Sequence, residues 1–164
     1  MNADPAATSS RRVVVGVDGS DSSKRALRWA AFLARASAST VEAVIVWTPP
    51  SEYTMMNAGL AGLAPSWTPD QGAKKALAAI VTDVFGDERP DGLQLTVWHG
   101  NPAQALIQAS QSAQLLVVGN RGHGGFAELL LGSVSLACAQ HAKCPVVVLH
   151  GDSLPPRLHD AHTA

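Results

Sequence analysis

The sequence has little cysteine and no pattern of metal-binding side chains. Cys138 and Cys144 are its only cysteines, and no C-x-x-C motif is present, which argues against a redox pair or a zinc site of the usual spacing. The six histidines form neither an H-E-x-x-H motif nor a pair at positions i and i+4. We therefore expect no structural metal, and we interpret both cysteines as small buried hydrophobic residues.

Long hydrophobic runs and a marked charge of either sign are also missing. No apolar stretch approaches the roughly 20 residues that a membrane-spanning helix needs. The formal net charge is −1 and lysine and arginine do not cluster, whereas binding to a phosphate backbone needs a basic surface. The first residues, MNADPAATSSRR, lack the basic-then-apolar order of a secretory signal. These absences predict a cytoplasmic protein that contacts neither membranes nor nucleic acids.

What is present is the composition of one folded domain. The chain has 164 residues, of which 46% are hydrophobic and 15% are charged, so it can bury a core without disulfides or metals. Residues 1–10 and 151–164 are rich in small, polar and proline residues, and we expect both to be flexible tails. A single domain over residues 11–150 is the interpretation that follows.

Strand and helix patterns alternate along this domain. The runs at 12–18, 41–47, 114–119 and 146–149 are short and apolar, as in parallel strands covered on both faces. An edge strand with one buried face is predicted where apolar residues, Leu93, Leu95 and Val97, alternate with Gln94, Thr96 and Trp98. Helices are expected from Ser20, Thr68, Asn101 and Gly132, because capping residues or a first-turn proline precede apolar residues at helical spacing. Residues 49–67 form an unusually long loop of unknown role. The alternation predicts an α/β fold with a doubly wound parallel sheet.

A glycine-rich stretch, GNRGHGGFAELLLGS, follows the strand at 114–119 and ends where Ser133 begins a helix. Glycines let the backbone approach an anion, and the free N–H groups and dipole of a helix start favour negative charge. Five glycines after a buried strand favour a phosphate site over a merely flexible loop. Arg121 and His123 could add positive charge there, with solvated side chains as an equal alternative.

Two better-known phosphate motifs do not fit this stretch. The Walker A pattern is excluded because no GK[ST] occurs in the chain. Gly122, Gly124 and Ala127 match the dinucleotide pattern G-x-G-x-x-A loosely, but that pattern belongs in the first strand-to-helix turn, not after the fourth strand.

The spacing Gly119-x2-Gly122-x9-Gly132-Ser133 instead resembles the nucleotide motif of the universal stress protein family, in its ATP-binding branch. The blocks VVVGVDGS, HGNPAQALIQAS, LLVVGNRGHGG, LLLGSVS and KCPVVVL are similar to that family's blocks, in the same order. The resemblance implies an open sheet of five parallel strands in the order 3-2-1-4-5. The sequence departs from the commonest family pattern at Gln114, where aspartate is frequent, and at Asn120, where a small residue is usual.

In such sheets, ligands bind beyond the carboxyl ends of the strands where the strand order reverses, which here lies between strands one and four. By the resemblance, residues of the first two strands would hold the nucleoside: Gly16, Val17 and Asp18, with Val46 against the adenine. Residues of the glycine-rich stretch and the helix after it would surround the phosphates: Gly119, Gly122, Gly124, Gly132, Ser133, Val134 and Ser135. For Asp18, capping of the first helix is an equal alternative. The ligand expected is ATP or another adenine nucleotide, alone or with Mg²⁺.

The function expected is that of a stress-response regulator whose nucleotide-bound state is read by a partner protein. Slow ATP hydrolysis or nucleotidyl transfer is a weaker alternative, because no Walker lysine or evident base is present. The third possible function is that of a nucleotide-free dimeric module, but the intact glycine spacing argues against it. A homodimer is expected through the uncharged edge strand formed by Val146, Val147, Val148 and Leu149, with coverage by the C-terminal tail as the alternative.

Overall fold

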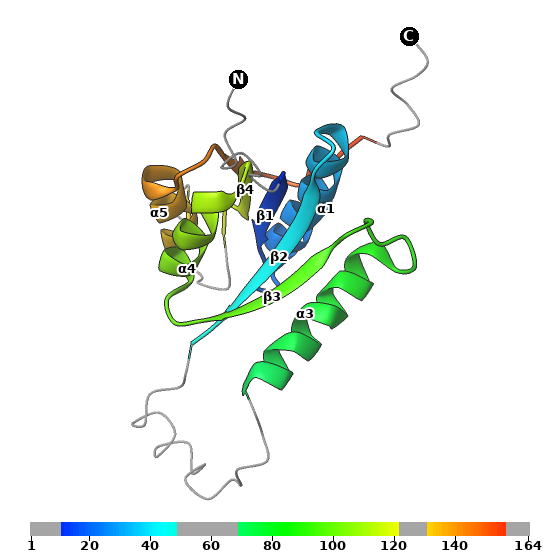
Figure 1. Cartoon of the computed structure of the whole chain (residues 1–164), viewed down its shortest axis with the longest axis horizontal. Helices are drawn as coiled ribbons and strands as arrows, with labels where there is room; N and C mark the ends of the chain where they lie inside the picture. The colour runs from blue at the N-terminus through cyan, green and yellow to red at the C-terminus, as the bar shows by residue number, and fades with distance from the viewer. Residues whose placement is uncertain (1–10, 49–68, 122–130, 157–164) are drawn as a thin grey trace, which may run out of the picture.

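The computed structural model describes residues 11–48, 69–121 and 131–156, which form a parallel sheet with helices on both faces (Figure 1). The strands are β1 (Arg12–Gly16), β2 (Thr40–Trp47), β3 (Gln94–His99), β4 (Leu115–Gly119) and β5 (Val146–Leu149). The helices are α1 (Asp21–Ala36), α3 (Pro69–Phe85), α4 (Pro102–Ala109) and α5 (Ser133–His141), and a 3-10 turn at Ser110–Ser112 follows α4.

The five strands lie in the order β3-β2-β1-β4-β5, and each neighbouring pair is parallel. Val13 of the central strand β1 is paired with Val41 on one side and with Leu115 on the other. The chain therefore moves outward through β2 and β3, returns across the sheet, and adds β4 and β5 on the far side of β1. This confirms the doubly wound fold and the strand order implied by the resemblance.

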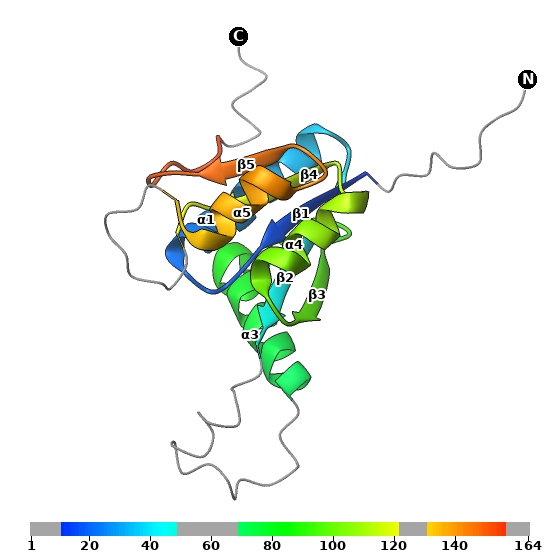
Figure 2. The ribbon, with the colours of Figure 1, turned by 90° about the vertical axis from the view of Figure 1, so that its left-hand side faces the viewer.

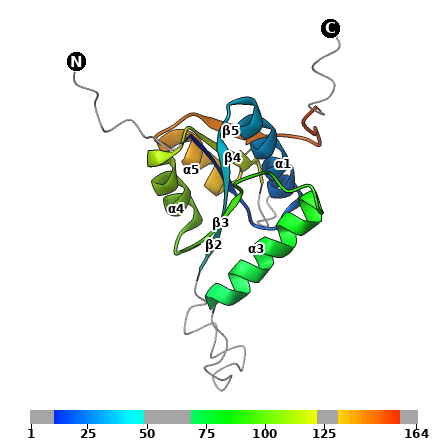
Figure 3. The same cartoon turned by 45° about the vertical axis from the view of Figure 1, so that its right-hand side comes forward.

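Two hydrophobic clusters sandwich the sheet, and successive valines of β1 point into different ones. Val13 and Val15 pack with α1 and α3, whereas Val14 packs with residues of α4 and α5 such as Leu106 and Cys138. Figures 2 and 3 show the same two layers, with α1 and α3 on one side of the sheet and α4 and α5 on the other. Because side chains alternate between the faces of a strand, burial of both faces explains the continuous apolar runs.

The helices begin where capping residues predict. Ser20 is the N-cap of α1, and its Oγ accepts a hydrogen bond from Ser23 N at 3.2 Å. Asn101 caps α4 through Oδ1, which accepts from Gln104 N at 3.1 Å, and Pro102 occupies the first helical position. These bonds satisfy backbone donors that a helix start leaves unpaired.

The other helix boundaries agree with the sequence where they can be compared. Helix α3 starts at Pro69, while its expected cap Thr68 and the long loop at 49–67 lie outside the described residues. Helix α5 ends at His141, close to the limit set by Pro145. In the described part of the chain, no helix is both long and apolar enough to cross a membrane.

Strand β3 lies at the sheet edge, as predicted, but its buried side chains differ from the prediction. Leu95, expected on the buried face, is 39% exposed. Trp98, expected on the poorly buried face, packs into the second cluster beside Val46, its neighbour on β2. Thr96 Oγ1 donates a hydrogen bond to Glu42 Oε1 at 2.8 Å. The alternation was misleading because helices cover both faces near this edge.

Candidate functional site

The candidate site is the crevice at the carboxyl ends of β1 and β4. Strand β1 ends at Gly16 and leads through Val17 and Asp18 into α1, while β4 ends at Gly119 and is followed by Asn120. The sheet order reverses between these two strands, so the starts of α1 and α5 reach this edge from opposite faces (Figure 2). The topology thus brings together residues that are far apart in the sequence.

The first turn of α5 presents backbone donors to this edge. Its first intrahelical hydrogen bond runs from Leu136 N to Gly132 O at 2.9 Å. The N–H groups of Ser133, Val134 and Ser135 find no acceptor within the ranges that the structure describes, and the side chain of Ser133 is exposed. Together with the positive end of the helix dipole, these donors can hold an anion.

Three hydrogen bonds fix the start of α5 and the end of β4 in place. Ser135 is 4% exposed, and its Oγ donates to Gly119 O at 2.6 Å. Gly132 N donates to Asn120 O at 2.7 Å, and Asn120 N donates to Leu149 O at 3.0 Å. The Ser135 hydroxyl, assigned from the sequence to the surroundings of the phosphate, therefore ties the helix to the sheet. Its backbone N–H is therefore the polar group of Ser135 that is left to bind an anion.

Two of the glycines assigned to the site have a packing reason for being glycine. A Cβ at Gly119 would lie 2.9 Å from both the carbonyl carbon and the Cβ of Ser22 in α1. A Cβ at Gly16 would lie 2.7 Å from Leu106 Cδ1 of α4. Helices on both faces thus approach the strand ends closely. Gly132 differs, because its φ of −67° is accessible to any residue and does not itself require glycine.

Asp18 shapes the turn between β1 and α1 but does not cap the helix. Its Oδ1 accepts hydrogen bonds from Ser20 N at 2.9 Å and from Ser20 Oγ at 2.6 Å. Because the N-cap is Ser20, the alternative in which Asp18 caps α1 is wrong. The turn leaves the Asp18 side chain exposed at the crevice.

Of the two valines assigned to the nucleoside, only Val46 has a side chain placed to touch a ligand. Val17 is 4% exposed and packs in the first cluster, while its backbone N donates to Val44 O at 2.8 Å. Val46 is half-buried near the end of β2, on the opposite face of the sheet. Val17 can therefore contribute backbone groups only.

The structure describes some of the remaining residues predicted for the site. Arg121 is exposed next to the end of β4, and Val134 is half-buried in the second cluster. Gly122, His123 and Gly124 lie outside the described residues. Across residues 11–48, 69–121 and 131–156, no group of histidine, cysteine and carboxylate side chains could hold a metal ion.

Ser22 was missed by the sequence analysis as a member of this site. It is 7% exposed, and its Oγ donates to Asn120 Oδ1 at 3.0 Å. The sequence did offer one sign of this contact, because Asn120 stands where a small residue is usual in the family. Without the fold, however, nothing connected that position with the second residue of α1.

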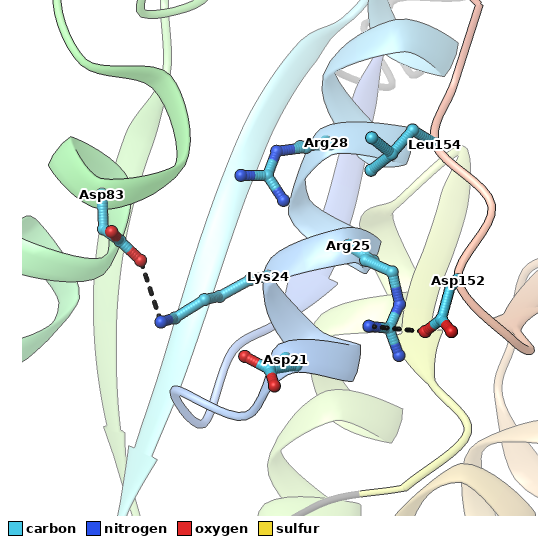
Figure 4. A pocket seen from close by; sticks show the side chains of 7 residues that line it. All are labelled: Asp21, Lys24, Arg25, Arg28, Asp83, Asp152 and Leu154. Carbon is cyan, nitrogen blue, oxygen red and sulfur yellow. Dashed lines mark ion pairs between the residues drawn. The ribbon is translucent and has the colours of Figure 1, made fainter.

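A second concavity lies along the outer face of α1, beginning at its first residue, Asp21 (Figure 4). It is an open groove of about 340 Å³ whose lining is mostly charged: Asp21, Lys24, Arg25, Arg28, Asp83, Asp152 and Leu154. Lys24 Nζ lies 2.8 Å from Asp83 Oδ2, and Arg25 Nη1 lies 3.2 Å from Asp152 Oδ1. Because lysine and arginine here are largely paired with carboxylates, the groove has no clear preference for an anion.

The two cysteines are not placed to act as nucleophiles. Cys138 is fully buried in α5, and burial raises the pKa of its thiol to about 11. Burial is also the main cause that raises the pKa of Cys144. Both thiols are therefore protonated at neutral pH, whereas the reactive form of cysteine is the thiolate.

Several known proteins with similar sequences or structures are described as universal stress proteins. Over 143 residues, the chain is 35% identical to a universal stress protein of Mycolicibacterium smegmatis; the match covers 85% of this chain and 48% of the relative. The chain thus spans about half the length of the curated relatives it matches. A universal stress protein solved in complex with cAMP is 32% identical, with a TM-score of 0.59, over 85% of this chain and 97% of the other.

The fold is shared more widely. A universal stress protein from Lactobacillus plantarum superposes with a TM-score of 0.68 at 21% identity, over 86% of this chain and 98% of that one. The model of the universal stress protein family matches residues 9–150, which include all five strands and the candidate site. The chain therefore belongs to the universal stress protein family.

Proposed function

We propose that this chain binds an adenine nucleotide, with ATP as the expected ligand, in the crevice between β1 and β4. The observation that carries the proposal is the fixed start of α5, where the N–H groups of Ser133, Val134 and Ser135 lack acceptors among the described residues. The relative solved with cAMP supports an adenine nucleotide rather than a simple anion.

The distribution of charge favours one orientation of the nucleotide. The exposed carboxylate of Asp18, at the end of β1, would repel phosphates but can accept hydrogen bonds from ribose hydroxyls. The donors of α5 and the exposed Arg121 lie next to the end of β4 and suit the phosphates. Val46 offers an apolar contact to the base near the end of β2. The ligand would thus run from β2 across β1 to α5.

A regulatory role fits this site better than catalysis. Hydrolysis of ATP needs a group that positions or deprotonates water and groups that stabilise the transferring phosphoryl. Asp18 supplies a carboxylate at the end of β1, and the proposed orientation places it at the ribose rather than beside the phosphates. We therefore infer that a partner protein reads the nucleotide-bound state, since a ligand regulates only by binding one state better than another.

The regulator is proposed to be a homodimer joined through β5. Leu116 N donates to Pro145 O, and Asn120 N donates to Leu149 O, so alternate residues of β5 bond inward to β4. The backbone groups of Val146 and Val148 between them point to the open edge. Pairing with the same edge of a second copy would satisfy them around a two-fold axis.

Calorimetry with ATP tests nucleotide binding directly. Wild-type protein should bind ATP, and Gly132→Val should lose binding because its side chain would occupy the space beside the α5 donors. Ala139→Val, an exposed position on the same helix, is the matched control and should bind as wild type does. Absence of binding by wild type, or unchanged affinity of Gly132→Val, would contradict the proposal.

Incubation with ATP and Mg²⁺ separates the regulator from a hydrolase or transferase. We expect negligible turnover by the wild-type protein. Multiple turnovers that disappear in Gly132→Val would instead establish catalysis at this site. A wild-type protein that folds and dimerises but never binds nucleotide would favour the third role, that of a nucleotide-free interaction module.

A further inference from the structure

Asn120 is held more tightly than its place in a loop requires. Its backbone N donates to Leu149 O at 3.0 Å, and its backbone O accepts from Gly132 N at 2.7 Å. Its side-chain Oδ1 accepts from Ser22 Oγ at 3.0 Å. The residue therefore bonds to β5, to the start of α5 and to the first turn of α1, all at the edge where the candidate site lies.

The bond from Ser22 fixes the direction of the amide group. Ser22 is 7% exposed, and α1 is pressed so closely against Gly119 that the serine has little freedom to move. With Oδ1 turned toward α1, the NH₂ group lies in the same amide plane but on the opposite side of the Cβ–Cγ axis, directed away from Ser22. Within the part of the chain that the structure describes, no acceptor is present for this NH₂ group.

We propose that the side-chain NH₂ of Asn120 donates a hydrogen bond to a phosphate oxygen of the bound nucleotide. The inference rests on the proposed nucleotide site and adds one residue to it. The backbone carbonyl of Asn120 accepts from Gly132 N, and Gly132 precedes the three N–H groups of α5 that lack acceptors among the described residues. A phosphate held by those groups would therefore lie near Asn120. An alanine or glycine at position 120 has no polar side-chain atom to accept from Ser22 or to donate to that phosphate. The departure at Asn120 thus supplies a donor that selects nucleotides over nucleosides.

The sharpest variant is Asn120→Asp, because aspartate keeps the oxygen that accepts from Ser22 while removing both amide donors and adding negative charge. Affinity for ATP should fall by about 10- to 100-fold, as expected when a hydrogen bond to a charged group is lost. Affinity for adenosine, which has no phosphate, should not change. Gln140→Glu, which introduces a similar charge at an exposed position of α5, should leave both affinities as in wild type.

Two further variants separate contact with the phosphate from support of the fold. Asn120→Ser removes the amide without adding charge, and it should also weaken ATP binding while sparing adenosine. Ser22→Ala removes the bond that orients the amide but keeps its donors, so its effect on ATP should be smaller than that of Asn120→Asp. Thermal unfolding of each variant shows whether the fold is retained.

Calorimetric titrations of these proteins with ATP and adenosine decide the matter. Selective loss of ATP affinity in Asn120→Asp and Asn120→Ser supports the inference. If wild type binds ATP and both variants bind it equally well, or if both lose ATP and adenosine alike, the inference is overturned and nucleotide binding stands. If wild type binds no nucleotide, the proposed function is wrong, and the proposed role of Asn120 is overturned as well.

Discussion

Arg12 and Glu42 form an ion pair across neighbouring strands, with Arg12 Nη1 2.8 Å from Glu42 Oε2 and the carboxylate side chain only 8% exposed. Arg12 Nη2 also donates to Ser112 Oγ at 2.6 Å, and Glu42 Oε1 accepts from Thr96. The pair therefore links β1, β2 and β3 with the turn after α4. It lies at the opposite end of β1 from the candidate site.

Glu42→Gln should destabilise the protein by about 3 kcal/mol, because it leaves the partly buried Arg12 guanidinium without its counter-charge. Urea denaturation of wild type and variant measures the difference in the free energy of unfolding. Asp83→Asn is the matched control: it breaks the exposed pair with Lys24 and should cause no resolvable change. Equal stability of Glu42→Gln and wild type would show that the pair is not needed.

Gly119→Ala should be more damaging than Gly16→Ala, although both add one methyl group at the site edge. At Gly119 the new Cβ meets backbone of α1 at Ser22, whereas at Gly16 it meets the end of a flexible side chain, that of Leu106. We expect a loss of about 1–3 kcal/mol for Gly16→Ala and a larger loss for Gly119→Ala. Leu106→Ala should interact favourably with Gly16→Ala in a double-mutant cycle of unfolding free energies, whereas strict additivity would contradict this account.

Cys138 should resist alkylation in the folded protein. In a Cys144→Ala background, iodoacetamide at pH 8 should modify Cys138 only after unfolding, because the thiol is buried and protonated. Mass spectrometry of native and urea-treated samples measures the modification. Rapid labelling of the native protein would contradict the burial of this side chain.

The raised pKa of Cys138 also has a consequence for stability at high pH. Because its pKa is raised from 9.0 to about 11 in the folded state, the unfolded chain ionises first. The stabilising contribution is therefore complete below pH 9 and is lost as the pH rises toward 11. The free energy of unfolding should fall more steeply over this interval for the Cys144→Ala protein than for Cys138→Ala/Cys144→Ala. Parallel curves for the two proteins would argue against the shift.

The proposed dimer should dissociate when an outward-facing backbone donor of β5 is removed. Val148→Pro deletes such an N–H without touching the bonds that Pro145 and Leu149 make to β4. Light scattering should show a wild-type dimer and a monomeric variant. Val147→Asp is a poorer choice, because Val147 packs against the first cluster and its replacement would disturb the core. A wild-type monomer at high micromolar concentration would exclude the dimer.

The fold could be predicted well because each local pattern agreed with the others. Continuous apolar runs marked buried parallel strands, and the serine and asparagine caps of α1 and α4 bond as their positions indicate. The edge strand β3 was less predictable, since which of Leu95 and Trp98 is buried depends on helices packed from both layers.

The candidate site could be located from the sequence, but the roles of its residues could be assigned only in part. The glycine spacing pointed to the start of α5. It could not reveal that Ser22 packs so closely against Gly119 that a side chain there would clash. Nor could it reveal that the Ser135 hydroxyl donates a hydrogen bond to the Gly119 carbonyl. Such contacts join different helices and strands, and their distances are set by packing rather than by local sequence.

The pairing of β1 with both β2 and β4 also determines when the binding crevice can form during synthesis. As the chain leaves the ribosome, β1 can pair with β2 early, because Val41, the partner of Val13 on β2, follows soon in the sequence. The other edge of β1 stays unpaired until β4, with Leu115, has emerged. The start of α5 and its anchor at Leu149 follow later still. The proposed nucleotide site is thus complete only after β5 has emerged, and a chain truncated before β5 would expose the unpaired edge of β4 to any strand nearby.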